Sequence, residues 1–243
     1  MQMEKSNQQP NNLTFKTGLK DGLPIGLGYL SVSIAFGVQA SMASLPIFMS
    51  VFISMTNLTS AGQLAGLTVI ATLGTFLEMI LTQLVINARY FLMGITLSQK
   101  ADESFSIGSR FFYSAFITDE IFAVAAGKKS IFGKKYFTGL IILPYLGWSI
   151  GTLIGAVAGN LLPLEITNAL GIALYAMFIA IIIPPSIKVK GVLPAVIFAS
   201  AISCAFYYIP FLSGVSTGIS VIISAVISAT VTAFLFPLAK EDA

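Results

Sequence analysis

Five long runs without a single charged residue constrain this chain more than any other feature. A helix needs about 20 predominantly apolar residues to cross the hydrocarbon of a bilayer. The composition agrees, because 56% of the residues are hydrophobic and only 9% are charged, whereas a soluble domain carries about a quarter of its residues as charged side chains. The sequence therefore predicts an all-α, polytopic integral membrane helix bundle, with clear spans at residues 22–39, 136–161, 166–183, 192–209 and 214–238.

The region between the first two of these spans is harder to divide. Residues 46–56 are too short to cross, and residues 57–98 form a proline-free stretch that is too long for one crossing, which we divide near Asn87. Residues 111–126 form a marginal span. Because these pieces are short or polar, we expect one or two of them to be re-entrant half-helices, which enter the membrane and return to the same face. We therefore expect seven or eight segments, with the exact number open.

The distribution of lysine predicts the orientation of the bundle. Basic residues concentrate in cytoplasmic loops. Lysines cluster at residues 16–20, 128–135 and 188–190, with Lys240 near the end, whereas the turns at 41–45, 159–165 and 210–214 carry no basic residue. We expect both termini in the cytoplasm. The expected organisation is a polar cytoplasmic tail (1–20), a single transmembrane domain (21–239) and a cytoplasmic end (240–243).

A short internal echo suggests two related halves. The sequence YLSVSI at residues 29–34 is matched by YLGWSI at residues 145–150, an offset of 116 positions. One interpretation is chance, since the apolar alphabet is small. The other is an internal duplication, with halves at residues 22–127 and 136–238, of the kind that builds transporters around a site at the membrane midplane.

Adjacent carboxylates at Asp119 and Glu120 stand inside an otherwise apolar run. An ionised side chain near the bilayer centre costs about 2.5 to 3.5 kcal/mol on insertion scales. One interpretation is an interfacial segment whose carboxylates face water, with Thr118 or Asp119 capping a short helix. The other is a polar cavity in which repulsion and desolvation raise the proton affinity of at least one carboxylate, so that a proton or a substrate ammonium neutralises it.

Glu78 and Arg89 are two further charges at the expected depth of lipid. They are eleven residues apart, which places them on one face of an unbroken helix but about 16 Å from each other. If the helix breaks near Asn87, Arg89 lies at a helix end and extends to the interface. The functional alternative places Arg89 opposite Asp119 or Glu120, where it lowers the cost of burying a carboxylate.

A second candidate site surrounds the sequence NLTSAGQ. Asn57, Ser60 and Gln63 lie around Gly62, and Gln39 ends the first span. A helix broken between residues 57 and 60, with Ser60 as its cap, would present free N–H groups and a positive dipole end to an anion such as a carboxylate. A plain turn is the alternative.

The absence of histidine from the sequence removes most enzyme classes. It excludes an HExxH metal site and a Ser-His dyad, and the sequence also has no GxxxxGK[ST] phosphate loop and no GxSxG elbow. We expect no enzyme activity, no metal and no cofactor. Trp148 and the other aromatic residues are interpreted as lipid-facing or interfacial anchors. A conduit or a carrier driven by gradients remains.

Several blocks, taken in order, resemble one family. GLPIGLGYLSVSIAFGV, LTSAGQLAG, INARYFLMGITLS, ITDEIFAVA and YLGWSIGTLIGAVAGNLLP are similar to the AzlC family, the large subunits of bacterial branched-chain amino acid exporters. The resemblance implies a permease of the bacterial cytoplasmic membrane that works with a small membrane subunit of the AzlD type. Its expected substrates are valine, leucine, isoleucine or a similar amino acid such as methionine.

The candidate residues suit such a substrate. A zwitterion needs a receptor for its carboxylate, which the helix end at residues 60–63 offers, and a receptor for its ammonium, which Asp119 or Glu120 offers. We therefore expect a proton-coupled exporter. A passive channel for small solutes or ions and a structural subunit of a membrane complex are the competing hypotheses.

Overall fold

The computed structural model is built from helices. It describes residues 13–159, 189–212 and 214–237, and the separate positions 161, 163, 165, 179, 182, 183 and 185–187, and it shows no β-strand within them. The expected span at 166–183 lies almost entirely outside the described residues. The predicted all-α class is confirmed. The helices are α1 (Phe15–Met42), α2 (Ile47–Thr56), α3 (Ser60–Ala71), α4 (Phe76–Lys100), α5 (Ile107–Ser114), α6 (Asp119–Ala126), α7 (Lys134–Ala158), α9 (Val192–Tyr208) and α10 (Thr217–Leu235).

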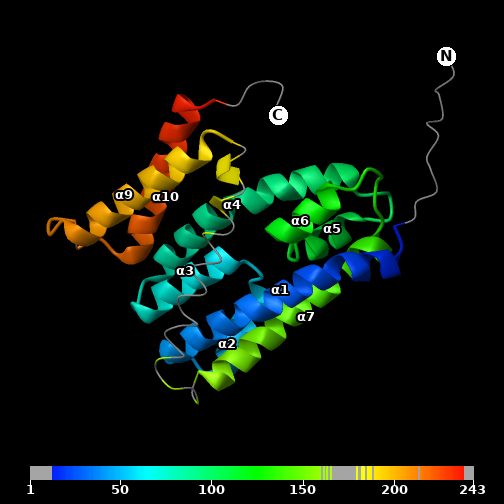
Figure 1. Cartoon of the computed structure of the whole chain (residues 1–243), viewed down its shortest axis with the longest axis horizontal. Coiled ribbons are helices and arrows are strands. Elements are labelled where there is room, and N and C mark those ends of the chain that lie inside the picture. The colour runs from blue at the N-terminus through cyan, green and yellow to red at the C-terminus, as the bar shows by residue number, and fades with distance from the viewer. Residues whose placement is uncertain are drawn as a thin grey trace.

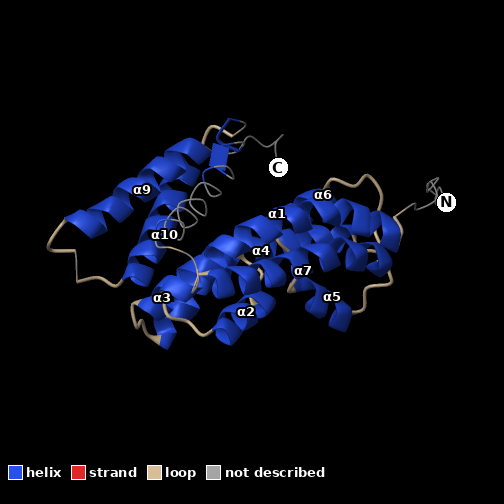
Figure 2. Cartoon of the chain, turned by 60° about the horizontal axis from the view of Figure 1, so that its bottom comes forward, coloured by secondary structure: helices blue, strands red, loops and turns tan. Residues whose placement is uncertain are grey.

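Four of these helices are long and apolar enough to cross a membrane, namely α1, α4, α7 and α10. Three shorter apolar helices, α2, α3 and α9, accompany them. Figure 1 shows α1 and α7 side by side, with α9 and α10 forming a second pair that lies beyond α4. The same two groups are seen in the turned view of Figure 2. Whether the chain has seven or eight segments stays a prediction.

Helices α1 and α7 are packed backbone to backbone through glycine. A Cβ atom added at any of these glycines would collide with the main chain of the other helix, and small residues are what allow such close approach in a membrane. Gly18 lies beside Gly139 and Gly37 beside Gly155, so the two helices are parallel. The glycines concerned are Gly18, Gly22, Gly26 and Gly37 in α1 and Gly139, Gly147, Gly151 and Gly155 in α7.

The two helices that carry the sequence echo are therefore neighbours. Gly139 is 121 positions beyond its neighbour Gly18, and Gly155 is 118 beyond Gly37, close to the 116 of the echo. Helices related by an inverted repeat would run in opposite directions, whereas a repeat about an axis along the membrane normal keeps them parallel. The internal duplication stays a prediction.

One end of the bundle is rich in lysine, and we call it the lysine end. Helices α1 and α7 begin there, and α4 and α6 end there. Lys128 Nζ lies 2.7 Å from Asp21 Oδ2 in α1. Lys100, the last residue of α4, donates to the carbonyl oxygens of Ala126, at the end of α6, and of Lys128, the latter at 2.9 Å. Together these contacts tie the helix ends to one another.

Helices α2 and α3 form a hairpin against the opposite half of α1 and α7. Ser54 of α2 and Thr152 of α7 have hydroxyl oxygens 2.7 Å apart, and Leu67 of α3 packs with Phe36 and Ala40 of α1. Residues 57–59 between them are not helical. A boundary between two helices is thus present at this sequence, and its role as an anion-binding helix end stays a prediction.

Helix α4 runs unbroken for 25 residues, so the predicted division near Asn87 is wrong. Its length of about 37 Å is enough for one crossing of a hydrocarbon core about 30 Å thick. The break lies earlier, at residues 72–75, where Leu73 has a φ of 55° and precedes Gly74. Thr75 then caps the new helix, because its Oγ1 accepts a hydrogen bond from the N–H of Glu78.

The predicted span at 111–126 is also wrong as one continuous helix. It contains the end of α5 and the whole of α6, which are helices of eight residues each, with residues 115–118 between them. Eight residues rise about 12 Å, far less than a crossing needs. Since α6 returns to the lysine end and packs on α4 and α1, α5 and α6 form a second hairpin in the other half of the bundle.

Candidate functional site

The breaks at residues 57–59 and 115–118 meet at a pair of buried aromatic side chains. Tyr29 lies near the middle of α1 and Trp148 in the middle of α7, and their rings pack edge to face with centroids 5.0 Å apart. Leu58, from the break between α2 and α3, belongs to the same buried cluster. Thr118, from the break between α5 and α6, contacts the Tyr29 hydroxyl at 2.6 Å. Four separate segments thus converge on one point of the α1–α7 pair.

Glu120 is bound by Tyr29, one member of this aromatic pair. The Tyr29 hydroxyl donates a hydrogen bond to the Glu120 carboxylate. Thr118, which is 3% exposed, is the N-cap of α6 and accepts a hydrogen bond from the N–H of Ile121. The cap expected from the sequence is thus present, and the carboxylate that it positions is partly buried.

Asp119 points to a different neighbour. Its Oδ2 lies 2.9 Å from Arg89 Nη1 of α4, and the two side chains are 26% and 40% exposed. The Arg89 guanidinium also lies over the ring of Tyr90, 5.0 Å from its centroid. Of the two alternatives for Arg89, the structure shows the pairing with a carboxylate, and it does not show the position at a helix end. Because both carboxylates stand in the first turn of α6, the helix dipole adds to their stabilisation.

Gln63 lies on the other side of Trp148 and is fully engaged. Its Oε1 accepts a hydrogen bond of 2.8 Å from Trp148 Nε1, and its Nε2 donates to the Ser54 hydroxyl, which in turn contacts Thr152. Gln63 is 1% exposed. Buried amides without partners are costly, so this chain of bonds fixes the start of α3 against α2 and α7.

Gln83 brings together three of the predicted residues, Asn57, Gly62 and Asn87. No pattern in the sequence indicated this role for Gln83. Gln83 Nε2 donates to the Gly62 carbonyl oxygen at 2.8 Å, and its Oε1 accepts from Asn87 Nδ2 at 2.9 Å. Asn57 Nδ2 approaches the same Oε1 at 3.5 Å. Asn87 packs directly against Gly62. The break at residues 57–59 is therefore tied to the middle of α4.

Three predicted residues have other positions. Ser60 is the first residue of α3, but the N-cap is Thr59, so its predicted role as the cap is wrong. Gln39 lies in the last turn of α1, which continues to Met42, and in the described part of the chain no side-chain bond joins it to this cluster. Glu78 faces α10 instead, where it accepts a hydrogen bond from Gly218.

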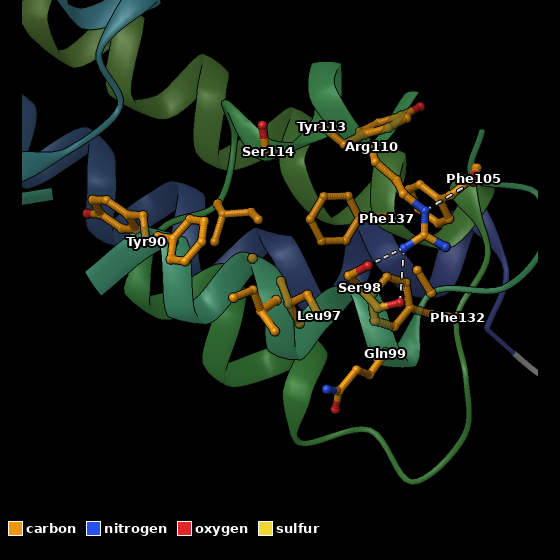
Figure 3. Close-up of a pocket in the computed structure, with 15 residues that line it drawn as sticks. Tyr90, Leu97, Ser98, Gln99, Phe105, Arg110, Tyr113, Ser114, Phe132 and Phe137 are labelled. Carbon is orange, nitrogen blue, oxygen red and sulfur yellow. Dashed lines mark hydrogen bonds between the residues drawn. The ribbon is translucent and has the colours of Figure 1, made fainter. Parts of the chain in front are cut away.

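An apolar cavity of about 650 Å³ begins one residue away from the charged pair. Tyr90 and Ile117 at its wall adjoin Arg89 and Thr118, and Figure 3 shows Arg110 among the residues that line it. Arg110 is fixed by hydrogen bonds from Nη1 to the Ser98 carbonyl oxygen at 3.0 Å and from Nε to that of Phe105 at 3.2 Å. No local pattern in the sequence indicated this cavity, because four separate segments form it.

The two aromatic residues at the centre were also missed as site residues. Trp148 is 2% exposed and donates a buried hydrogen bond, so its interpretation as a lipid-facing or interfacial anchor is wrong. One signal was available in the sequence. Tyr29 belongs to the sequence YLSVSI and Trp148 to the matching sequence YLGWSI. These two sequences lie in α1 and α7, the helices that pack closely against each other.

The fold and this site define a helical integral membrane protein with two broken-helix hairpins around a buried polar centre. The chain belongs to the AzlC family, because the family model described as AzlC protein matches residues 24–162. This matched segment contains α1 from residue 24 onward, all of α7, both hairpins and the charged pair.

Related proteins have the same membrane character. The chain is 28% identical to the inner membrane protein YgaZ of Escherichia coli over 74% of this chain and 78% of YgaZ. It is 27% identical to a membrane protein of Archaeoglobus fulgidus, over 80% and 85% of the two chains. A membrane protein of Helicobacter pylori is 23% identical over 69% and 73%. No solved structure was found to match the chain.

Proposed function

We propose that this protein is a proton-coupled secondary transporter that exports branched-chain amino acids, valine, leucine, isoleucine or the similar methionine, across the bacterial cytoplasmic membrane. The observation that carries the proposal is the meeting of two helix breaks, one from each half of the bundle, at Tyr29 and Trp148. Secondary transporters bind substrate near the midplane, at discontinuous helices whose ends point at the ligand.

In this proposal α2–α3 and α5–α6 are re-entrant hairpins that enter from opposite membrane faces. The lysine end is the cytoplasmic one, in keeping with the positive-inside rule, and both termini are cytoplasmic. The hairpin α5–α6 then opens to the cytoplasm and α2–α3 to the outside. The parallel course of α1 and α7, both of which begin at this end, supports the assignment.

Each part of an amino acid has a receptor near the centre. Asp119 and Glu120 attract the ammonium, and the N-terminus of α3, at residues 60–63, attracts the carboxylate. The cavity beside Tyr90 and Ile117 is lined mainly by apolar side chains and suits an aliphatic side chain. Proton coupling must use carboxylates, since the chain has no histidine to relay protons.

The family resemblance supplies the proposed partner, a small membrane subunit of the AzlD type. The surface of α4 is open to such a contact. Only 11% of the residues in its most apolar 18-residue stretch are buried, against 44% in the corresponding stretches of α1 and α7. Lipid covers this surface in the absence of a partner.

Substrate exchange in proteoliposomes tests the proposal. The protein is reconstituted with and without its neighbour-encoded small membrane protein, loaded with unlabelled leucine, isoleucine, valine or methionine, and supplied with the labelled amino acid outside. A carrier exchanges label with saturation, and Asp119→Asn combined with Glu120→Gln abolishes the exchange. Flux without saturation or exchange indicates a channel, and full exchange by both single variants and the double variant contradicts the role given to the carboxylates.

A further inference from the structure

A second buried polar cluster lies away from this site, where the first turn of α4 meets the first turn of α10. Glu78 of α4 is 5% exposed. Its Oε1 accepts a hydrogen bond of 2.8 Å from the backbone N–H of Gly218, so an acidic side chain of one helix lies at the N-terminus of another. We call these residues, with Thr82 and Ser216, the Glu78 cluster.

Two hydroxyl groups accompany the carboxylate without partners of their own. Thr82 is fully buried, and its Oγ1 has no hydrogen-bond partner among the described residues. The same holds for the buried Oγ of Ser216, the residue that precedes α10. A Cβ atom at Gly218 would lie 2.5 Å from Glu78 Oε1 and 2.9 Å from Thr82 Oγ1. The carboxylate oxygen and the Thr82 hydroxyl therefore face the same small space.

Among the described residues, no positively charged side chain pairs with Glu78. The three helices that pack around it in the described chain are α4, α3 and α10, and the sequences of α3 and α10 contain no charged residue. The nearest charge along α4 is Arg89, three turns away and paired with Asp119. Buried carboxylates are costly without a counter-charge, and buried hydroxyls without partners are costly as well. A bound cation would offset both costs.

We infer that the Glu78 cluster binds the monovalent cation, a proton or a sodium ion, whose gradient drives the transport cycle. Glu78 supplies the negative charge, and Thr82 and Ser216 supply neutral oxygen ligands at a helix end, where transporters coordinate coupling ions. The inference rests on the proposed function. It separates the coupling site from the substrate site, since Glu78 lies at the opposite end of α4 from the lysine end and Asp119 contacts the middle of that helix.

The competing interpretation is structural, with Glu78 only capping α10. Glu78→Gln separates the two, because the amide oxygen still accepts the hydrogen bond from Gly218 while the charge and the exchangeable proton are lost. Thr82→Val removes the hydroxyl and keeps the shape of the side chain. Matched controls are Thr96→Val, at an exposed threonine of the same helix, and Glu103→Gln, at an exposed glutamate beyond it.

Cation binding is measured first without transport. The full chain is purified in nanodiscs, and its melting temperature is followed as sodium chloride replaces choline chloride at constant ionic strength, and separately as the pH is lowered without sodium. A ligand that binds only the folded state raises the melting temperature. We expect one of the two cations to stabilise the wild type and both controls. Glu78→Gln abolishes this response, and Thr82→Val raises the half-saturating concentration about tenfold, the equivalent of one lost ligand.

Equal cation responses of wild type and Glu78→Gln overturn the inference, and so does a wild type that responds to neither cation. If Glu78→Gln does not fold, the shift of the Thr82→Val and Ser216→Ala titrations decides in the same way. The melting-temperature titrations test the cation site even if no amino acid is transported. A failure of the proposed function is therefore distinguishable from a failure of the cation site.

Transport then tests the coupling role. In proteoliposomes, Glu78→Gln should lose gradient-driven accumulation by at least about tenfold and keep labelled-leucine exchange near the wild-type rate. Unchanged accumulation contradicts the coupling role. An equal loss of exchange contradicts it as well, because it would place Glu78 in substrate binding or in the structural framework.

Discussion

Tyr29 and Trp148 pack edge to face across the α1–α7 interface, and their polar atoms point to opposite hairpins. The Tyr29 hydroxyl bonds to Glu120 and Thr118 in the hairpin α5–α6, and the Trp148 indole N–H bonds to Gln63 in the hairpin α2–α3. The pair is thus the shared contact of two elements that otherwise lie in different halves of the bundle.

Removal of the Tyr29 hydroxyl should impair transport more than stability. Tyr29→Phe keeps the ring contact with Trp148 but leaves Glu120 without its donor, at a cost of about 1 to 3 kcal/mol for a hydrogen bond to a charged group. We expect leucine exchange to fall at least about tenfold while the protein remains monodisperse. Tyr207→Phe, at a residue that is 79% exposed on α9, is the matched control. Wild-type exchange by Tyr29→Phe would contradict the role of this bond.

The Arg89–Asp119 pair should show coupling in a double-mutant cycle. The side chains are partly exposed, so we expect a modest interaction free energy of about 1 kcal/mol. Arg89→Gln alone leaves Asp119 without its counter-charge and should lower the melting temperature more than Arg89→Gln combined with Asp119→Asn. Thermal unfolding of the four proteins in nanodiscs provides the measurement. Strictly additive effects would mean that the two charges do not interact.

The glycine contacts of α1 should be intolerant of a methyl group on one face only. Gly26→Ala places a Cβ 2.8 Å from the Leu143 carbonyl oxygen, whereas Gly28 has nothing within 4 Å. We expect Gly26→Ala to destabilise the protein by about 1 to 3 kcal/mol through overpacking. Gly28→Ala should be neutral or stabilising by up to about 1 kcal/mol, since alanine favours helix. Equal melting temperatures for the two variants would contradict the packing described for α1 and α7.

The position of α2 can be checked by a disulfide. The hydroxyl oxygens of Ser54 and Thr152 are 2.7 Å apart, so cysteines at both positions should cross-link on mild oxidation. The exposed native Cys204 is first replaced by serine. Thr56→Cys with Thr152→Cys is the control, because Thr56 is exposed and bonds to its own helix. Cross-linking is read as a mobility shift after proteolysis between the two helices, and equally fast cross-linking of both pairs would contradict the contact.

The sequence predicted features that depend on residue type and local spacing. Charged side chains in apolar surroundings need partners, and this reasoning led from Asp119 to Arg89. Asn57 and the residues after it interrupt an apolar pattern, which indicated the break between α2 and α3. The membrane class followed from the uncharged runs alone.

Other features depend on contacts between distant segments and could not be predicted from the sequence. The polar residue Asn87 is the predicted point of division, yet α4 continues through it, and its Nδ2 donates to Gln83 of the same helix. The burial of Trp148 depends on Gln63, which lies 85 positions away. The cavity beside Tyr90 exists only once several segments have been assembled around it.

The close backbone contact of α1 and α7 limits how this protein can move. Two helices joined by interdigitated glycines along most of their length cannot slide or rock against each other without steric collision. They therefore form one rigid unit. Any change in which membrane face has access to the central site must therefore come from the short hairpins α2–α3 and α5–α6, which pack against α1 and α7. In the transporter that we propose, access would alternate through small movements of the two hairpins, one toward each membrane face, while α1 and α7 stay in place.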